Sequence, residues 1–526
     1  MGVTSTVREL PSEVLPPPRP TGRRLPWRPA AAVAAGLLQV LALPPHDVWP
    51  AALLGVALLA AAVHGRRVRS GALAGLLCGL ALFVPLLHWS GSVAGPAAWL
   101  ALAVLQTAFF VPLGAALALV SRLPAWPLWG AALWVGQEAL RDRLPFGGFP
   151  WGRLAFGQAG GPLAPLASLG GAPLVTFAVA LLGGALALAC HVLAGRVPAC
   201  HVLARRGPRR GLLPTAAVAL VLLLGALLVP TPTAGQQVRV ALVQGNVPRL
   251  GLSAFGQRAA VLRNHVDATH RLAEAVRAGT ERRPDLVLWP ENASDLDPYT
   301  DAAASALIDG AVRDVGVPVL VGAVVDGPGE KISNLGIVWD PVTGPGRTYS
   351  KQHPVPFGEY MPYRSLLRRI SDKVDLVPRD FARGTGTGVL QVGPARVGDV
   401  ICFEVAYDGL VRDAVREGGR VLVVQTNNAS FGRSGQSAQQ LAMGRLRAVE
   451  HGRSVLVAAT SGISAVISPD GSVAQRSGIF TADTLTADVP LRDAQTPATR
   501  LGALPELLLA LLGAAAVAGA LVRRRR

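Results

Sequence analysis

The segment Arg396-Val-Gly-Asp-Val-Ile-Cys402-Phe-Glu404 decides the fold of the second half of this chain. It reads as an apolar strand that ends at a cysteine, and the stretch Tyr407–Val415 after it reads as a helix. A thiol at such a turn faces the helix N-terminus, whose partial positive charge lowers the thiol pKa and favours the thiolate. Cys402 is therefore a candidate nucleophile, and the alternative is a small buried apolar residue at a strand end.

Around this segment, residues 236–500 alternate short β-rich stretches with amphipathic helices. Candidate strands are Val238–Gln244, Asp285–Trp289, Pro318–Val325, Gly336–Asp340, Val389–Val392, Val397–Cys402, Val421–Gln425, Ser454–Ala459 and Ala465–Ser468. Candidate helices are Arg258–Ala278, Thr300–Val315, Gly409–Glu417 and Ser437–Gly452. The alternation predicts an α/β domain in which helices cover a largely buried sheet.

The rest of the chain consists mainly of long apolar runs. With 51% hydrophobic and only 16% charged residues, the composition excludes an ordinary soluble protein. Eight runs approach or reach the length of about 20 residues that spans a bilayer, and a count of six or seven stays open. These runs are Ala30–Leu43, Trp49–Val63, Gly71–Ser90, Ala97–Val120, Trp126–Leu140, Pro173–Leu193, Leu212–Val229 and Ala503–Val522.

The distribution of charge predicts the partners and the orientation. The net charge of +17 lies mostly in short arginine-rich connections between apolar runs, so nucleic acid is rejected as a partner. With eight spans these connections fall on one side, which the positive-inside rule makes cytoplasmic. Arg141, Arg143 and Arg153 are the exceptions. Residues 236–495 are then an extracytoplasmic domain, and both termini are cytoplasmic.

This orientation divides the chain into five parts. Residues 1–28 form a cytoplasmic tail without a removed signal peptide, and residues 29–232 form a membrane domain of about seven helices. The α/β domain at 236–495 follows, then a last span at 503–522 and an arginine tail at 523–526.

A thiol nucleophile requires a base and a group that stabilises negative charge. Glu291 directly follows an apolar strand, although a solvated loop glutamate is an equally simple interpretation. Lys351 is one of only three lysines in an arginine-rich chain and lies in a Pro-rich loop, where a compact ammonium suits an oxyanion. Glu359 and Glu404 are either supporting carboxylates or ordinary surface and helix-start residues.

These segments together resemble the nitrilase superfamily and, within it, the membrane-embedded apolipoprotein N-acyltransferases. The resemblance extends from about Gly36 to the final helix. The motifs that carry it are Leu43–Pro50, Gly147–Trp151, Val243–Asn246, Trp289–Glu291, Lys351–Glu359, Ile401–Glu404, Arg445–Arg453 and Thr460–Ser464. It implies an α-β-β-α sandwich with Glu291 as general base, Lys351 as oxyanion stabiliser and Cys402 as nucleophile, supported by Glu359 and Glu404.

The implied activity moves an acyl chain, expected to be the sn-1 chain of a membrane phospholipid, through a Cys402 thioester. The acceptor is the α-amine of the diacylglyceryl cysteine of bacterial apolipoproteins. We expect a monomer in the bacterial cell membrane, without cofactor or metal, since no CxxC or HExxH motif occurs. Two alternatives remain: a membrane-tethered amidase using the same residues, and a scaffold or transporter without catalysis.

Three further features concern the surroundings of the thiol. Phe146–Trp151 and Pro354–Tyr363 are apolar, turn-rich segments that are candidates for a lid or a membrane-facing mouth. Phe403 stands where many family members carry tyrosine, and Thr426–Gly432 lacks the family's usual Asp and Trp. The loop Pro248–Phe255 contains no tryptophan.

Overall fold

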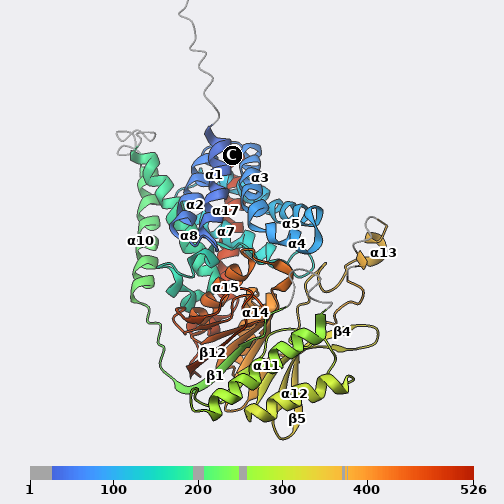
Figure 1. Ribbon diagram of the computed structural model, residues 1–526. Coiled ribbons are helices and arrows are strands. Elements are labelled where there is room, and N and C mark those ends of the chain that lie inside the picture. The colour runs from blue at the N-terminus through green and yellow to red at the C-terminus, as the bar shows by residue number, and fades with distance from the viewer. Residues whose placement is uncertain (1–26, 194–205, 248–256, 370–373, 376, 526) are drawn as a thin grey trace, which may run out of the picture.

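The computed structural model describes residues 27–193, 206–247, 257–369, 374–375 and 377–525. The predicted tail up to residue 26, Cys200 and the loop Pro248–Phe255 lie outside these residues. Figure 1 shows two parts, a helical bundle and a part built on two sheets, joined through the long helix α10 (Arg206–Leu228) and through the C-terminal helix α17 (Leu504–Arg525).

Every one of the eight predicted apolar runs is helical. The helices and helical turns before the first strand are α1 (Trp27–Ala42), α2 (Pro50–Val63), α3 (Val68–Leu86), η1 (His88–Ser90), α4 (Gly91–Ala94), α5 (Pro96–Ala108), α6 (Phe110–Val120), α7 (Trp126–Arg141), η2 (Leu154–Gln158), η3 (Ala164–Leu166), α8 (Ala167–Leu193) and α10. The glycine pair Gly170 and Gly171 kinks α8 near its start, because both residues leave the helical region of φ and ψ.

Within the described residues, four helical stretches are long and apolar enough to cross a membrane: Val68–Leu86, Pro96–Val120, Ala164–Leu193 and Leu504–Arg525. Shorter apolar helices occur at Trp27–Ala42, Pro50–Val63 and Leu212–Leu228. The predicted count of about eight spans therefore stays a prediction.

The bundle leaves leucines exposed on its outer helices. Leu227 and Leu228 of α10 are each 75% exposed, and Leu508 and Leu511 of α17 are each 56% exposed. Exposed leucines on outer helices are typical of helices in contact with lipid.

The second part contains two mixed six-stranded sheets. The first has the order β12-β1-β2-β3-β4-β5 and the second β11-β10-β9-β8-β7-β6. The strands are β1 (Gln236–Gln244), β2 (Leu286–Leu288), β3 (Val319–Asp326), β4 (Ile332–Asp340), β5 (Gly344–Ser350), β6 (Val389–Val392), β7 (Ala395–Ile401), β8 (Val421–Thr426), β9 (Val455–Ala459), β10 (Ala465–Ile467), β11 (Val473–Arg476) and β12 (Asp483–Leu491).

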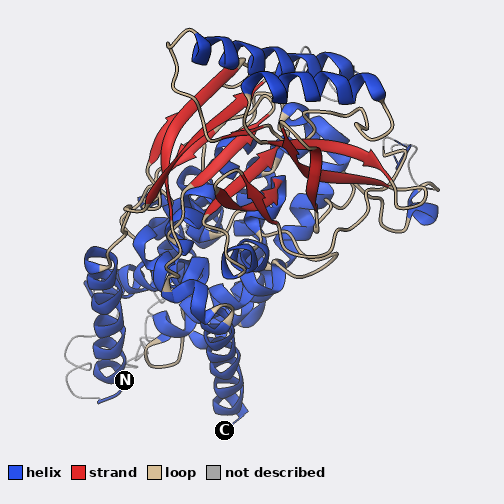
Figure 2. Ribbon diagram, turned by 90° about the horizontal axis from the view of Figure 1, so that it is seen from below, coloured by secondary structure: helices blue, strands red, loops and turns tan. Residues whose placement is uncertain are grey.

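Helices cover the outer faces of both sheets, which gives the predicted α-β-β-α sandwich (Figure 2). The helices and turns of this part are α11 (Arg258–Arg277), α12 (Ala302–Val315), α13 (Arg364–Leu367), η6 (Cys402–Ala406), α14 (Asp408–Arg416), η7 (Ala429–Phe431), α15 (Gln436–His451) and α16 (Pro497–Leu501). The pair α11 and α12 packs on the first sheet, whereas α14 and α15 lie between the second sheet and the bundle. Nearly all of α15 is buried, because it packs on β9 and β10 as well as on α8.

The nine predicted strands and four predicted helices of this part are present, with ends that differ by up to a few residues. Three strands were not predicted: β5, β11 and β12. β12 pairs antiparallel with β1 over nine residue pairs, from Gln236 with Leu491 to Gln244 with Asp483. The start and the end of the domain therefore lie side by side.

Candidate active site

Cys402 lies at the carboxyl end of β7, where the chain turns sharply into η6. Its φ is +57°, a left-handed conformation that costs energy for any residue with a side chain. The residue is only 5% exposed, and the Oγ1 of Thr426 lies 3.4 Å from its Sγ. A strained, buried thiol at a strand end is typical of a nucleophile at an enzyme active site.

The expected depression of the Cys402 thiol pKa is wrong. Burial raises this pKa and the negative charge of Glu291 raises it further, while Lys351 and the Thr426 hydrogen bond act in the opposite direction. The expected helix N-terminus is also displaced, because a single turn of η6 separates Cys402 from α14, which begins at Asp408. A base beside the thiol is therefore needed to form the thiolate.

The predicted base and cation meet in the same buried region. The Nζ of Lys351 donates to Oε1 of Glu291 at 2.9 Å and to Oε1 of Glu359 at 2.6 Å. Lys351 is 1% exposed and Glu291 4%. Burial by itself would lower the pKa of Lys351, but the two carboxylates outweigh it and hold this pKa well above its usual value. The lysine is thus a fixed cation between two carboxylates.

Glu291 is held by groups that the sequence did not reveal as site residues. Asn334 Nδ2 donates to its Oε1 at 2.6 Å, and the backbone N–H of Asn427 donates to its Oε2 at 2.8 Å. Thr460 Oγ1 donates to the backbone carbonyl of Glu291 at 2.9 Å. These donors come from three other strand ends or strands, so the fold fixes the carboxylate from several directions.

Glu404 is fully buried and connects the cysteine turn to the lysine loop. One of its carboxylate oxygens accepts the backbone N–H groups of Gln352 and His353, at 2.6 and 3.0 Å. The other accepts the backbone N–H of Ile401 at 2.7 Å and the hydroxyl of Tyr349 at 2.9 Å. Glu404 thus sets the position of Lys351 relative to Cys402 without touching either side chain.

Aromatic rings from the bundle line the region beside the thiol. The ring of Phe403 lies 4.7 Å from that of Trp151 and 5.9 Å from those of Trp89 and Phe431, measured between centroids. The indole N–H groups of Trp89 and Trp151 both donate to Oε1 of Gln439, which keeps their apolar faces free for packing. The cysteine turn therefore borders an apolar wall to which the bundle contributes Trp89 and Trp151.

The two predicted lid segments lie against each other. Phe146 packs edge-on against Phe357 at 5.8 Å and against Tyr363 at 6.0 Å between ring centroids. The hydroxyl of Tyr407 donates to the carbonyl of Gly148 at 2.9 Å. All three rings of this contact are exposed, Tyr363 by 71%. This contact is an exposed apolar rim that joins the bundle to the loop carrying Glu359, the partner of Lys351.

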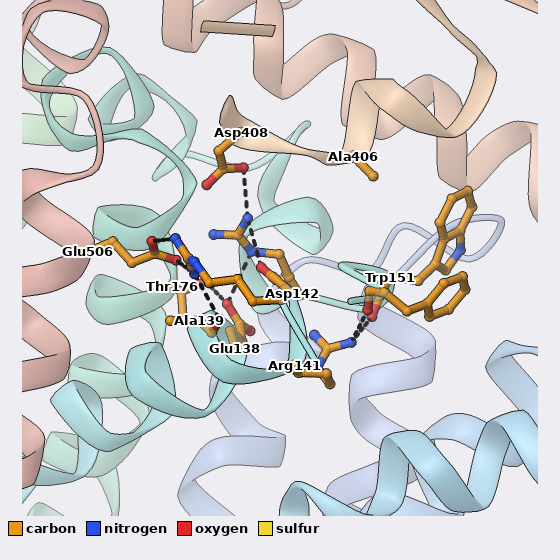
Figure 3. Close-up of polar contacts among 12 residues, drawn as sticks. Glu138, Ala139, Arg141, Asp142, Trp151, Thr176, Ala406, Asp408 and Glu506 are labelled. Carbon is orange, nitrogen blue, oxygen red and sulfur yellow. Dashed lines mark hydrogen bonds and ion pairs between the residues drawn. The ribbon is translucent and has the colours of Figure 1, made fainter. Parts of the chain in front are cut away.

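A cluster of buried charges fastens the sandwich to the bundle (Figure 3). Arg153 follows the loop after α7, and its guanidinium lies 2.8 Å from Asp408, 3.2 Å from Asp142 and 3.4 Å from Glu138. Arg447 of α15 also pairs with Asp408, at 2.6 Å. Burial alone would raise the pKa of Asp408, but the two guanidinium groups outweigh it and hold this pKa well below its usual range.

The same region contains Arg141, Arg143 and Arg153, the three arginines that did not fit the positive-inside distribution. Arg141 is 1% exposed and donates to the carbonyls of Phe149 and Trp151, while Arg143 pairs with Glu506 of α17 (Figure 3). Arg153 is neutralised by the carboxylates named above. These arginines therefore have structural partners.

No group of three or more His, Cys, Asp or Glu side chains arranged to hold a metal ion occurs among the described residues. The groups gathered at Cys402 are a thiol, carboxylates and one ammonium, which together suit acyl transfer through a covalent intermediate.

Known proteins share both parts of the chain. The model described as apolipoprotein N-acyltransferase N-terminal domain matches residues 35–185, and the model described as carbon-nitrogen hydrolase matches residues 239–498. An apolipoprotein N-acyltransferase of Mycolicibacterium smegmatis is 43% identical, over 94% of this chain and 86% of its own length. One of Azotobacter vinelandii is 35% identical, over 94% of this chain and 95% of its own length. Among solved structures, an amidase from Nesterenkonia sp. aligns with a TM-score of 0.34 and 19% identity, over 51% of this chain and 94% of that one.

The fold and the matched models define a class, a carbon-nitrogen hydrolase domain joined to a helical bundle with membrane-spanning character. Identity along nearly the whole length narrows this class. The chain belongs to the apolipoprotein N-acyltransferase family, as its sequence motifs predicted.

Proposed function

We propose that this protein is an acyltransferase that N-acylates apolipoproteins, and that Cys402, Glu291 and Lys351 carry the reaction. The single observation that carries the assignment of residues is the Lys351 ammonium, buried between Glu291 and Glu359 in the region of Cys402. A fixed ammonium stabilises an oxyanion most strongly where water is excluded.

In the first half-reaction, Glu291 takes the proton of Cys402, and the sulfur attacks the carbonyl carbon of a phospholipid acyl ester, expected to be the sn-1 ester. Lys351 stabilises the tetrahedral oxyanion. When the ester C–O bond breaks, Glu291 returns the proton to the departing oxygen. A lysophospholipid leaves and a thioester remains on Cys402.

In the second half-reaction, the α-amine of a diacylglyceryl cysteine attacks the thioester carbon and forms the amide bond. Glu291 accepts the proton of the amine, and the C–S bond breaks to release the Cys402 sulfur, which regains a proton. The two substrates thus react in turn at one site. Glu359 keeps Lys351 charged, and Glu404 keeps its loop in place.

Several features support lipid substrates. The aromatic wall beside Phe403 and the exposed rings of Phe146, Phe357 and Tyr363 offer apolar surface to acyl chains.

We propose that residues 236–495 lie outside the cytoplasm of a bacterial cell, that residues 29–232 and 503–522 anchor them in the cell membrane, and that both termini are cytoplasmic. We further propose that the protein acts as a monomer.

The test is a single-turnover experiment on purified protein in detergent or nanodiscs. A phospholipid with a labelled sn-1 chain is added without acceptor, and the Cys402 peptide is examined by mass spectrometry for a hydroxylamine-labile acyl adduct, with Cys402→Ala as control. Addition of a diacylglyceryl peptide should then transfer the label to its amine. Release of the carboxylic acid and the amine from small amides, without any transfer of an acyl chain to the lipid amine, would instead establish the amidase alternative.

A further inference from the structure

The carboxyl end of β8 brings a hydroxyl group to the sulfur of Cys402. Thr426 is the last residue of this strand and is 1% exposed, and its Oγ1 lies 3.4 Å from Sγ in hydrogen-bonding geometry. β8 runs parallel to β7, the strand that ends directly before Cys402, so both side chains lie at the same edge of the sheet. The contact is therefore built by paired strands and not by a loose loop.

The Thr426 hydroxyl has a second neighbour, Oε1 of Gln440, at 3.2 Å. That oxygen already accepts Nδ2 of Asn428 at 2.9 Å and Nε2 of Gln436 at 3.3 Å. A carbonyl oxygen has two lone pairs, so two amide donors fill them. The single hydroxyl hydrogen is then left for the sulfur, which becomes the stronger acceptor once it is ionised.

We infer that Thr426 is a further catalytic residue, whose hydroxyl donates a hydrogen bond to the Cys402 thiolate when Glu291 removes the thiol proton and again when the thioester collapses. This role rests on the proposed nucleophile. It adds a stabiliser that acts on the sulfur, whereas Lys351 acts on the oxyanion.

The position of the next residue strengthens the inference. The backbone N–H of Asn427 donates to Oε2 of Glu291 at 2.8 Å. Two consecutive residues at one strand end thus contact the sulfur and the carboxylate between which the proton moves. In such a layout the thiolate and the base are stabilised by one rigid element.

The experiment measures how fast Cys402 reacts with iodoacetamide, from pH 6 to pH 10, by quantifying the alkylated Cys402 peptide in the full-length protein. Thr426→Val removes the hydroxyl at nearly constant volume, and Thr426→Ser keeps it. Thr499→Val is a matched control, because Thr499 is equally buried but bonds to His451 and Thr496 instead. N-acetylcysteine in the same tube reports on the reagent, and fully buried Cys78 becomes alkylated only if the fold opens.

We expect Thr426→Val to slow Cys402 alkylation about tenfold at pH 8 and to move its pH profile upward, since a hydrogen bond to a charged group is lost. The Cys402 alkylation rates of Thr426→Ser and Thr499→Val should stay within about twofold of the wild-type rate, a much smaller change than that expected for Thr426→Val. Unchanged Cys402 reactivity in Thr426→Val, with Cys78 still protected, would overturn the role. If Thr426→Val opens the fold, the Cys402 alkylation rates of Thr426→Ala and Thr426→Ser are compared instead.

The same samples separate this inference from the proposed function. A wild-type protein that forms no thioester from phospholipid refutes Cys402 as the acyl carrier, whatever Thr426 does. A wild-type protein that forms the thioester, together with a Thr426→Val variant that forms it at the same rate, refutes Thr426 alone.

Discussion

Arg153 and Asp408 form an ion pair of 2.8 Å that joins the loop after α7 to the first residue of α14. Arg447 shares the same carboxylate and also donates to the carbonyls of Val405 and Ala406, at 2.9 and 2.8 Å. These carbonyls belong to η6, the turn that begins with Cys402. The position of Cys402 is thus tied, through Arg447, Asp408 and Arg153, to the loop that follows α7 of the bundle.

Arg153→Met should destabilise the protein by about 3–5 kcal/mol, because it leaves several buried carboxylates without their counter-charge. Thermal unfolding in detergent, followed by tryptophan fluorescence, measures the loss. Arg368→Met is the control: the side chains of Arg368 and its partner Asp375 are 55% and 59% exposed, so the loss of this ion pair should cost about 0–1 kcal/mol. Equal effects of both substitutions would contradict the structural role assigned to Arg153.

Lys351→Met should abolish thioester formation and also lower stability. The substitution removes the cation from between Glu291 and Glu359, so both carboxylates lose their counter-charge, at a cost of about 3–5 kcal/mol. The double variant Lys351→Met with Glu359→Gln should recover part of the stability but none of the activity. Single-turnover acylation and thermal unfolding together measure this split, and recovered activity would refute the oxyanion role.

The pH dependence of Cys402 reactivity follows from its raised thiol pKa. The reactive thiolate is the deprotonated form, so its fraction grows as pH rises and reaches its limit only above the pKa. A simple thiol levels off just above its pKa of about 8.5. Alkylation of Cys402 should still be increasing there, and N-acetylcysteine in the same tube is the reference. If the alkylation rate of Cys402 stopped increasing at a lower pH than that of N-acetylcysteine, the thiol pKa of Cys402 would be lowered and not raised.

Gly336→Ala should destabilise the sandwich. A Cβ at this position of β4 would lie 2.3 Å from Oδ2 of Asp399 and 2.7 Å from Oε1 of Gln425, both in the buried space between the sheets. Such overpacking costs about 1–3 kcal/mol. Gly310→Ala in α12 is the control, because no atom lies within 4 Å of its added Cβ. It should raise stability by about 0.5–1 kcal/mol, and chemical denaturation compares the two.

The strands that the sequence predicted are the ones with continuous apolar residues, such as β8, whose six residues are all buried. β12 was missed because Asp483–Leu491 mixes threonine, aspartate and proline and is only partly covered. β5 begins Gly-Pro-Gly and reads as a loop. Both strands are defined by their partners β1 and β4, and pairing between distant segments leaves little trace in local composition.

Some residues of the candidate site could likewise be predicted from the sequence, whereas others are revealed only by the fold. Cys402, Glu291 and Lys351 stand out because each is chemically unusual in its surroundings. Asn334 and Thr426 do not, since a polar residue at a strand end is ordinary and becomes part of a site only through what the fold places beside it. The raised thiol pKa was likewise missed, because burial depends on the complete fold.

The pairing of β1 with β12 has a consequence for biogenesis. A ribosome makes β1 about 240 residues before it makes β12, so the first sheet lacks its edge strand until almost the whole chain has been synthesised. During that interval the nascent chain carries an unpaired strand edge, which is a template for incorrect pairing. Production of this protein should therefore depend on translation reaching the last tenth of the message, and premature termination there should yield aggregates instead of a shortened enzyme.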